Sequence, residues 1–157
     1  MRLPTPLLHR RLDANKGDFG HILILAGSLK FSGAAALASE AAMRSGSGLV
    51  TLGIPESLNN AVIKIKPREV MTLPLSATRE GSLSLSAYAK IKDFIKHAEG
   101  LLVGLGLSTN KSTQALVRKI ACSFVKPLVI DADGLNAFAN HPDKLKLAAR
   151  KAKDVVI

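Results

Sequence analysis

Two glycine-rich turns are the segments of this sequence that are best suited to hold a ligand. Gly27, Ser28 and Gly33 bracket the first turn, between an apolar and an alanine-rich segment, and residues 104–106 (Gly-Leu-Gly) form the second. Glycine lets a backbone approach a phosphate or a ring closely, and a helix N-terminus attracts anions. The first turn matches neither the GxGxxG dinucleotide fingerprint nor a P-loop, which ends in Gly-Lys-Ser/Thr. Tight turns that bind nothing therefore stay open as the alternative for both segments.

A pair of carboxylates follows another apolar segment. Asp131 and Asp133 are suited to hold Mg²⁺ through water or to orient a hydroxyl, because both are tasks of carboxylate oxygens. In the structural alternative, Asp133 or Asn136 caps the next helix and Asp131 accepts backbone N–H bonds. For Asp133 we favour the structural interpretation.

The histidines show no pattern of a metal site. Lys16, Asp18 and His21 precede the first apolar segment and could form a polar cluster near the mouth of the first turn. Alternatively, His21 is a residue at a strand edge that bonds to a backbone carbonyl, which we favour. The other histidines lack metal-ligand spacing with one another and with Cys122; they are His9, His97 and His141. We therefore expect no metal site, and spacing alone identifies no Ser–His–Asp triad.

Alternating strands and helices must position these turns. Apolar segments predict strands at 21–26, 49–54, 67–75, 101–103, 127–131 and 155–157, and periodicity predicts helices at 34–44, 56–65, 84–98, 112–124 and 143–153. This order predicts an α/β fold with a mainly parallel sheet and right-handed crossovers. Ligands gather at the carboxyl ends of such strands, where the two glycine turns and the carboxylate pair all lie.

The composition predicts one domain, residues 1–157. The chain has 157 residues, of which 47% are hydrophobic and 22% charged, as in globular proteins with a proper core. No apolar run approaches the ~20 residues that cross a bilayer, and the first residues lack the features of a secretory signal. Because the single Cys122 forms no intrachain disulfide, we expect a cytoplasmic protein.

The net charge raises the question of an anionic partner. At +10 it is compatible with nucleic acid, a membrane surface or small polyanions. The basic residues are scattered, however, and a cluster within residues 144–153 alternates with leucine and alanine as on the solvated face of a helix. With one tyrosine, no tryptophan and no stacking motif, we expect no nucleic-acid and no membrane partner.

The last three residues, Val155, Val156 and Ile157, are apolar and β-branched. A domain rarely ends inside such a strand, because its edge would be bare and hydrophobic. We therefore expect a fold truncated at its C-terminus. The open edge would pair with a missing C-terminal half or with another chain, and we expect a homo-oligomer.

Six segments together resemble the NAD(P)H-hydrate dehydratases, ribokinase-like repair enzymes of the carbohydrate-kinase superfamily. They are residues 16–21 (KGDFGH), 26–28 (AGS), 32–35 (SGAA), 44–50 (RSGSGLV), 103–107 (VGLGL) and 129–136 (VIDADGLN). The resemblance departs from the family pattern at Asn15, where histidine is usual, at Leu105, where proline is usual, and at Gly134, where alanine is usual. These mild departures leave the backbone geometry intact.

The resemblance implies a three-layer α/β/α fold and a known reaction. In that family ADP or ATP, with Mg²⁺, phosphorylates the hydroxyl of hydrated NAD(P)H (NAD(P)HX), phosphate leaves, and the dihydropyridine ring is restored. An aspartate acts as base, and the chemistry rests on positioning and electrostatic stabilisation. The substrate-binding residues carried over by position are Gly33, Ala34 and Gly106, followed by the weaker candidates Gly27, Ser28, Gly104 and Asp131.

The later motifs of the family are missing. Thr-Pro-His-Pro-Gly-Glu and Gly-Thr-Gly-Asp, the second of which carries the phosphate cradle and the catalytic aspartate, do not occur. The resemblance thus places no catalytic residue in this chain and puts most of the nucleotide site outside it. Two alternatives stay open: a catalytically silent half-domain that binds a dinucleotide or a partner chain, and a small-molecule kinase of the same superfamily.

Overall fold

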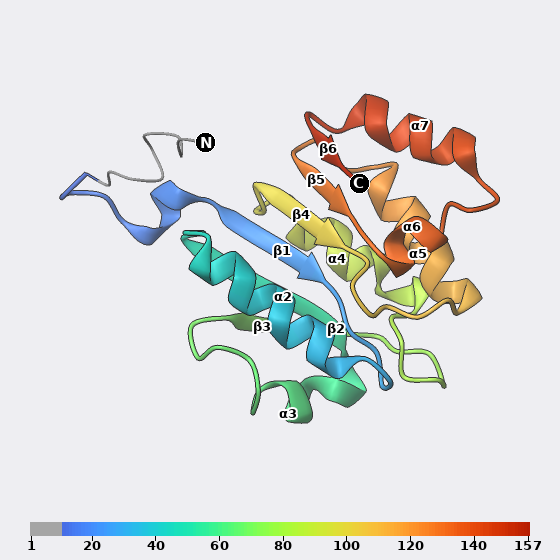
Figure 1. Ribbon diagram of the computed structural model, residues 1–157, viewed down its shortest axis with the longest axis horizontal. Coiled ribbons are helices and arrows are strands. Elements are labelled where there is room, and N and C mark those ends of the chain that lie inside the picture. Colours follow the sequence, from blue (N-terminus) through green and yellow to red (C-terminus); the bar gives the residue numbers. More distant parts are fainter. Residues whose placement is uncertain (1–10) are drawn as a thin grey trace.

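A six-stranded parallel sheet forms the centre of the molecule (Figure 1). The computed structural model describes residues 11–157, and the strand order is β3-β2-β1-β4-β5-β6 with every neighbouring pair parallel. The strands are β1 (His21–Leu25), β2 (Leu49–Pro55), β3 (Met71–Leu75), β4 (Gly100–Val103), β5 (Leu128–Ile130) and β6 (Val155–Val156). The predicted α/β class and parallel sheet are confirmed.

The later helices are shorter or more divided than periodicity predicted, whereas the first helix begins two residues earlier than predicted, at Ser32. They are α2 (Ser32–Arg44), α3 (Asn59–Val62), α4 (Tyr88–Phe94), α5 (Lys111–Ala121), α6 (Asp133–Asn136) and α7 (Pro142–Lys151), with 3₁₀ turns η1 (Lys16–Phe19), η2 (Glu56–Leu58) and η3 (Leu85–Ala87). The segments 56–65 and 84–98 each begin with a 3₁₀ turn. Residues 67–70 are not part of a strand, since Val70 N–H bonds back to the Pro67 carbonyl in a turn. None of the helices in the described part of the chain is long and apolar enough to cross a bilayer.

The central strand β1 divides its side chains between two cores, because successive side chains point to opposite faces. On one face Leu23 and Leu25 of β1 are fully buried beneath α4, α5 and α7. On the other face Ile24 is fully buried beneath α2 and α3. The two cores hold the strand ends, and therefore the loops after them, in fixed positions.

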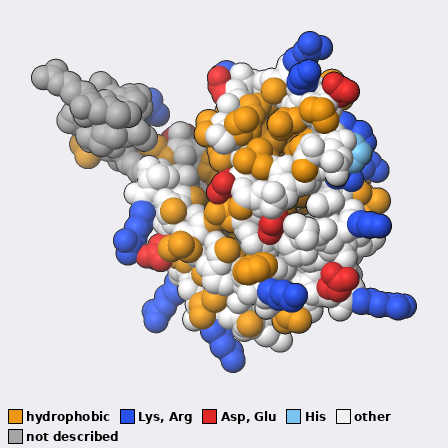
Figure 2. Space-filling view, turned by 45° about the vertical axis from the view of Figure 1, so that its right-hand side comes forward, with side chains coloured by type: hydrophobic (Ala, Val, Ile, Leu, Met, Phe, Trp, Pro, Cys, Tyr) orange, Lys and Arg blue, Asp and Glu red, His pale blue; other side chains and the backbone are white. Residues whose placement is uncertain are grey.

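The α2 face of the sheet is covered over only half its width. Helix α2 packs on β1 and β2, and in Figure 1 it runs alongside β1 and in front of β2, whereas no helix lies in front of β5 and β6. Val129 is 36% exposed there, and Val156 is 61% exposed. A hollow of about 590 Å³ runs between α2 and these strands, lined by three alanines of α2 and by Leu102, Leu105, Val129, Val156 and Ile157, among others. Hydrophobic side chains gather on this side of the molecule in Figure 2. We call this surface the open apolar face.

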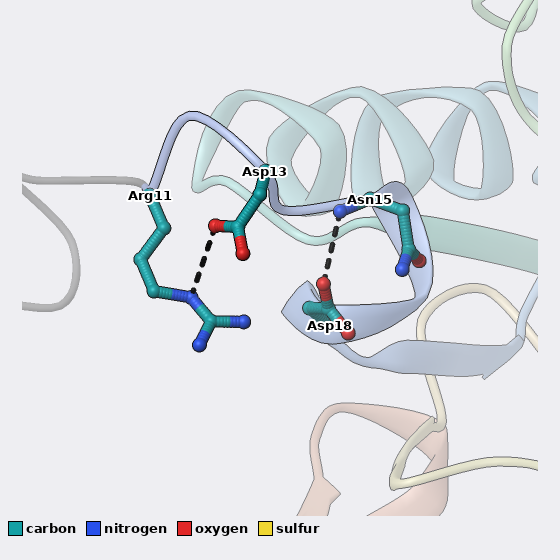
Figure 3. A network of polar contacts seen from close by, with 4 residues as sticks. All are labelled: Arg11, Asp13, Asn15 and Asp18. Atoms are coloured by element: carbon teal, nitrogen blue, oxygen red, sulfur yellow. Dashed lines mark hydrogen bonds and ion pairs between the residues drawn. The ribbon is translucent and has the colours of Figure 1, made fainter.

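The segment before β1 forms a capped 3₁₀ turn that packs against the residue preceding β2. Asn15 Oδ1 accepts the Gly17 N–H at 2.8 Å, and Asp18 Oδ2 accepts the Asn15 N–H at 2.9 Å, which forms a capping box for η1 (Figure 3). Gly48 lies so close that a Cβ atom there would overlap the Lys16 carbonyl oxygen. These contacts explain Asp18 and Gly48 without a ligand.

The predicted polar cluster near the mouth of the first turn is wrong. Lys16, Asp18 and His21 lie at the amino end of β1, whereas the first turn follows its carboxyl end. The length of the strand therefore separates these three residues from the turn. His21 Nε2 lies 2.8 Å from Thr51 Oγ1, so its ring bonds to a hydroxyl and not to the backbone carbonyl that we favoured. The His21 N–H donates to Glu99 Oε2 at 2.6 Å.

This environment makes the stability of the chain depend on pH. Partial burial lowers the pKa of His21 below 6.5, Glu99 opposes this effect and His97 adds to it slightly. The folded state therefore binds a proton less readily than the unfolded state, and stability falls as the pH drops below about 6.5. His21→Gln should flatten this fall between pH 7 and pH 5, measured by urea unfolding. His141→Gln serves as the control, and an identical slope in the His21 variant and the parent would contradict the expectation.

Candidate functional site

The strand order reverses direction between β1 and β4, and this is where ligands bind in open α/β sheets. The loops that follow these two strands are joined directly. Gly27 N–H donates to the Leu105 carbonyl at 2.8 Å, and Gly104 N–H donates to the Leu25 carbonyl at 3.1 Å. The two glycine-rich turns of the sequence therefore form one site.

The structure brings Ala34 and Gly106 together. Gly106 has φ +66°, and a Cβ atom there would lie 2.7 Å from Phe31 Cβ and 3.0 Å from Ala34 Cβ. Gly33, one residue before Ala34, is exposed and has nothing within 4 Å of its would-be side chain. The first turn of α2 thus meets the second glycine turn with one side left open for a ligand.

Gly27, Gly104 and Asp131 have structural tasks in the same region. A Cβ atom on Gly104 would overlap the Asp131 carbonyl oxygen, and one on Gly27 would lie 2.9 Å from Ala35 Cβ. Asp131 Oδ1 accepts the Ala132 N–H at 2.7 Å, as the structural alternative predicted. Close packing therefore accounts for these residues, and their role toward a substrate stays a prediction.

Asp133 does not cap the helix that follows it. It is the first residue of α6, and the N-cap is Ala132 with φ +48°. Asp133 Oδ2 instead accepts the Ser108 N–H at 2.8 Å, and its Oδ1 accepts the Asn136 side-chain amide at 3.1 Å. The carboxylate thereby ties α6 to the loop after β4, where Ser108 has φ +74°. Within residues 11–157 no three His, Cys, Asp or Glu side chains gather to hold a metal ion.

A cavity of about 780 Å³ opens beside these loops. It is lined by Ser28, Lys30, Phe31, Glu80, Ser108, Thr109, Asn110, Lys111 and Asp133. Of these residues, the sequence analysis singled out Ser28 as a site candidate and Asp133 as a carboxylate of interest. Residues 30–31 and 108–111 follow predicted strands, and this position marked them as possible ligand contacts. Nothing in the sequence pointed to Glu80, which comes from a distant polar loop.

The loop that carries Glu80 is anchored by buried hydroxyls. Thr113 Oγ1 lies 2.9 Å from Ser82 Oγ and 2.7 Å from the Leu83 carbonyl, and Thr78 Oγ1 lies 2.8 Å from Ser82 Oγ. Ser82 and Thr113 are buried. The loop is also joined to the first glycine turn, because Leu29 N–H donates to the Gly81 carbonyl at 2.9 Å. The loop of Glu80 is thus joined to the loop after β1 and to α5 at the rim of the cavity.

Ser28 is an unusual residue in this wall. Its side chain is 2% exposed, and its Oγ has no hydrogen-bond partner within the described residues. An unpaired buried hydroxyl costs free energy of about 1–3 kcal/mol, so a native structure rarely keeps one without a reason. Ser28 thus places an unpaired, buried hydroxyl in the wall of the cavity.

Known proteins resemble the chain over most of its length. The sequence model described as NAD(P)H-hydrate dehydratase matches residues 22–157. A bifunctional NAD(P)H-hydrate repair enzyme Nnr of Moorella thermoacetica is 35% identical over 135 residues, which cover 86% of this chain and 25% of that protein. The protein of the same description from Salinibacter ruber is 38% identical over 137 residues, 85% of this chain and 24% of that protein. The chain spans about a quarter of the length of these curated relatives.

Solved structures agree with the sequence comparison. An ADP/ATP-dependent NAD(P)H-hydrate dehydratase from Bacillus subtilis, co-crystallised with ATP/Mg²⁺, is 27% identical with a TM-score of 0.64 and covers 81% of this chain and 42% of its own. A ribokinase-like superfamily protein from Enterococcus faecalis has a TM-score of 0.71 and is 20% identical in sequence. The match covers 85% of this chain and 44% of that protein's chain, and it supports the fold alone. The fold and the family match over residues 22–157 lead to one conclusion: this chain belongs to the NAD(P)H-hydrate dehydratase family and has its ribokinase-like α/β fold.

Proposed function

We propose that this chain forms the substrate-side part of an enzyme that repairs hydrated NAD(P)H (NAD(P)HX) by nucleotide-dependent dehydration. The observation that carries this proposal is the meeting of Ala34 and Gly106 at the point where the strand order reverses. These are positions that the family resemblance assigns to the substrate. The family match over residues 22–157 supports the same reading.

The residues of the site would bind and orient the substrate. The exposed Gly33 and the neighbouring Ala34 leave the start of α2 open, and Gly106 brings a second backbone segment against it. Gly27, Ser28, Gly104 and Asp131 stay weaker candidates for substrate contact. We assign no catalytic residue to this chain.

For the complete enzyme we propose ADP or ATP as phosphoryl donor, with Mg²⁺. The support is the Bacillus subtilis relative, which was co-crystallised with ATP/Mg²⁺. Residues 11–157 supply no cluster of acidic, histidine or cysteine side chains for the cation, so no step of the reaction is assigned to a metal or nucleotide held by this chain.

We further propose that residues 1–157 are the N-terminal portion of a single ribokinase-like domain. The remainder of that domain, or another copy of the chain in a homo-oligomer, would cover the open apolar face, since apolar surface of this extent favours burial. A cytoplasmic protein fits the single thiol. Burial raises the pKa of Cys122, which disfavours the reactive thiolate, and its Sγ bonds to the Lys144 carbonyl at 3.4 Å.

Gly106→Ala should weaken binding of NADPH, as a stable analogue of the substrate, by at least about tenfold. The new Cβ atom would press on Phe31 and Ala34 and would strain a residue with φ +66°. Strain of this kind costs about 1–2 kcal/mol, so the variant should also be less stable.

Gly20→Ala is the matched control for strain. Gly20 has φ +78° but lies at the opposite end of β1. It should lose comparable stability and keep the affinity of the parent in isothermal titration calorimetry. If Gly106→Ala binds NADPH as well as Gly20→Ala does, Gly106 is only a turn residue and the observation that carries the proposal is lost.

A further inference from the structure

Two lysines that line the cavity form no ion pair with a described residue. Lys30 comes from the loop after β1 and Lys111 from the start of α5, and both side chains line the cavity and are exposed. Neither forms an ion pair with another described residue; the ion pairs there join Arg11, Arg44 and Lys96 to nearby carboxylates. Two positive charges from separate loops thus converge on one hollow.

The backbone adds to this positive potential. Helix α5 has 11 residues and begins at the cavity, where Asn110 Oδ1 accepts the Ser112 N–H at 2.9 Å and so fixes the first turn. The N-terminus of such a helix carries a partial positive charge. Independently of the helix, the buried Ser28 presents a hydroxyl without a partner in the same wall.

The two carboxylates that line the cavity, Glu80 and Asp133, differ in how far their oxygens are already engaged. Both oxygens of Asp133 accept hydrogen bonds, from Ser108 N–H and from the Asn136 amide. Glu80 is exposed on its loop and is the one lining carboxylate without a hydrogen bond or ion pair to a described residue. Glu80 is therefore the group that would oppose an anion.

We propose that this cavity binds a phosphate group of the dinucleotide substrate, held by Lys30 and Lys111 at the start of α5. The inference rests on the proposed function and extends it to a second part of the substrate, because Gly33, Ala34 and Gly106 do not line this cavity. A phosphate offers several acceptor oxygens and negative charge, which matches two ammonium groups, a helix N-terminus and a free hydroxyl. The phosphate has two possible sources: the diphosphate common to both cofactors, and the 2′-phosphate that only the NADP form carries.

The test is a set of titrations on the purified chain with NADH, NADPH and inorganic pyrophosphate. Lys30→Met and Lys111→Met combined should weaken NADPH binding at least about tenfold, as expected for lost charge-assisted hydrogen bonds. Glu80→Gln should tighten binding, because it removes the repelling charge. Lys64→Met and Lys92→Met combined, which remove two exposed lysines that do not line the cavity, serve as the charge-matched control.

The arms of the experiment separate the two sources. Equal losses for NADH and NADPH assign the cavity to the diphosphate, and a loss confined to NADPH assigns it to the 2′-phosphate. Unchanged binding in the Lys30/Lys111 variant, or an equal loss in the control, overturns the inference. If the variants keep their NADPH affinity while Gly106→Ala loses it, the proposed function survives and the phosphate site falls. If pyrophosphate binds the parent but not the Lys30/Lys111 variant, while neither dinucleotide binds the parent, the cavity is an anion site and the proposed function is wrong.

Discussion

Gly104→Ala should destabilise the chain by about 3 kcal/mol or more, the largest effect that we expect from a single methyl group. The residue has φ +138°, a conformation that L side chains rarely adopt. The new Cβ atom would overlap the Asp131 carbonyl oxygen and would lie 2.8 Å from Gly134 N. That carbonyl cannot move aside freely, because it accepts the Gly134 N–H at 2.8 Å while Asp131 N–H bonds to Val103 at 3.2 Å.

Gly33→Ala is the control that adds the same methyl group without these obstacles. Nothing lies within 4 Å of its would-be Cβ atom, and the residue belongs to the first turn of α2. Alanine favours a helix over glycine by up to about 1 kcal/mol, so this variant should be as stable as the parent or slightly more stable. Urea unfolding of both variants measures the difference. A Gly104→Ala chain with the stability of the parent would show that the loop after β4 is not held against β5 in solution.

Lysines on the open apolar face should change the association state of the purified chain. We expect the parent to associate with increasing concentration, because Val129, Val156 and Ile157 lie exposed around an apolar hollow. Val129→Lys and Val156→Lys combined place two charges on this face and should yield a monomer in sedimentation velocity. Burying an ammonium group without a counter-charge is far costlier than leaving it in water, so association through this face should stop.

Val125→Lys supplies a matched control for the lysine variant. Val125 is 61% exposed, as Val156 is, and it lies outside the hollow. It should leave association unchanged. A parent chain that is monomeric at every concentration tested would contradict the view that this face requires a cover.

The sequence by itself determined the class of the fold and the order of its elements. Strands such as β1 and β2 are nearly continuous apolar runs, because a parallel strand is buried on both faces and shows this in adjacent residues. The glycines at 27 and 104 were recognisable for a similar reason: they stand directly after such runs, and their positive φ values are a local property. The family resemblance over residues 16–136 added the ribokinase-like fold, which the solved structures support.

Only the tertiary structure decided which segments meet. The strand order places β1 beside β4, although 74 residues lie between the end of β1 at Leu25 and the start of β4 at Gly100, and so unites the two glycine turns. Asp133 was misread as a helix cap because capping is a local pattern, whereas its partner Ser108 lies 25 residues earlier. His21 was placed near the first turn although its contacts, Thr51 and Glu99, belong to the opposite end of the sheet.

Glu80 and the hydroxyl network behind it had no signal in the sequence at all. Thr113 and Ser82 are 31 residues apart, and their bond exists because α5 packs against the loop that Ser82 ends. The periodicity of apolar residues and the residue types of turns reveal only interactions among residues that are close in sequence. Hydrogen bonds and charges that cross from one loop to another depend on strand order and helix packing, which arise only when the whole chain has folded.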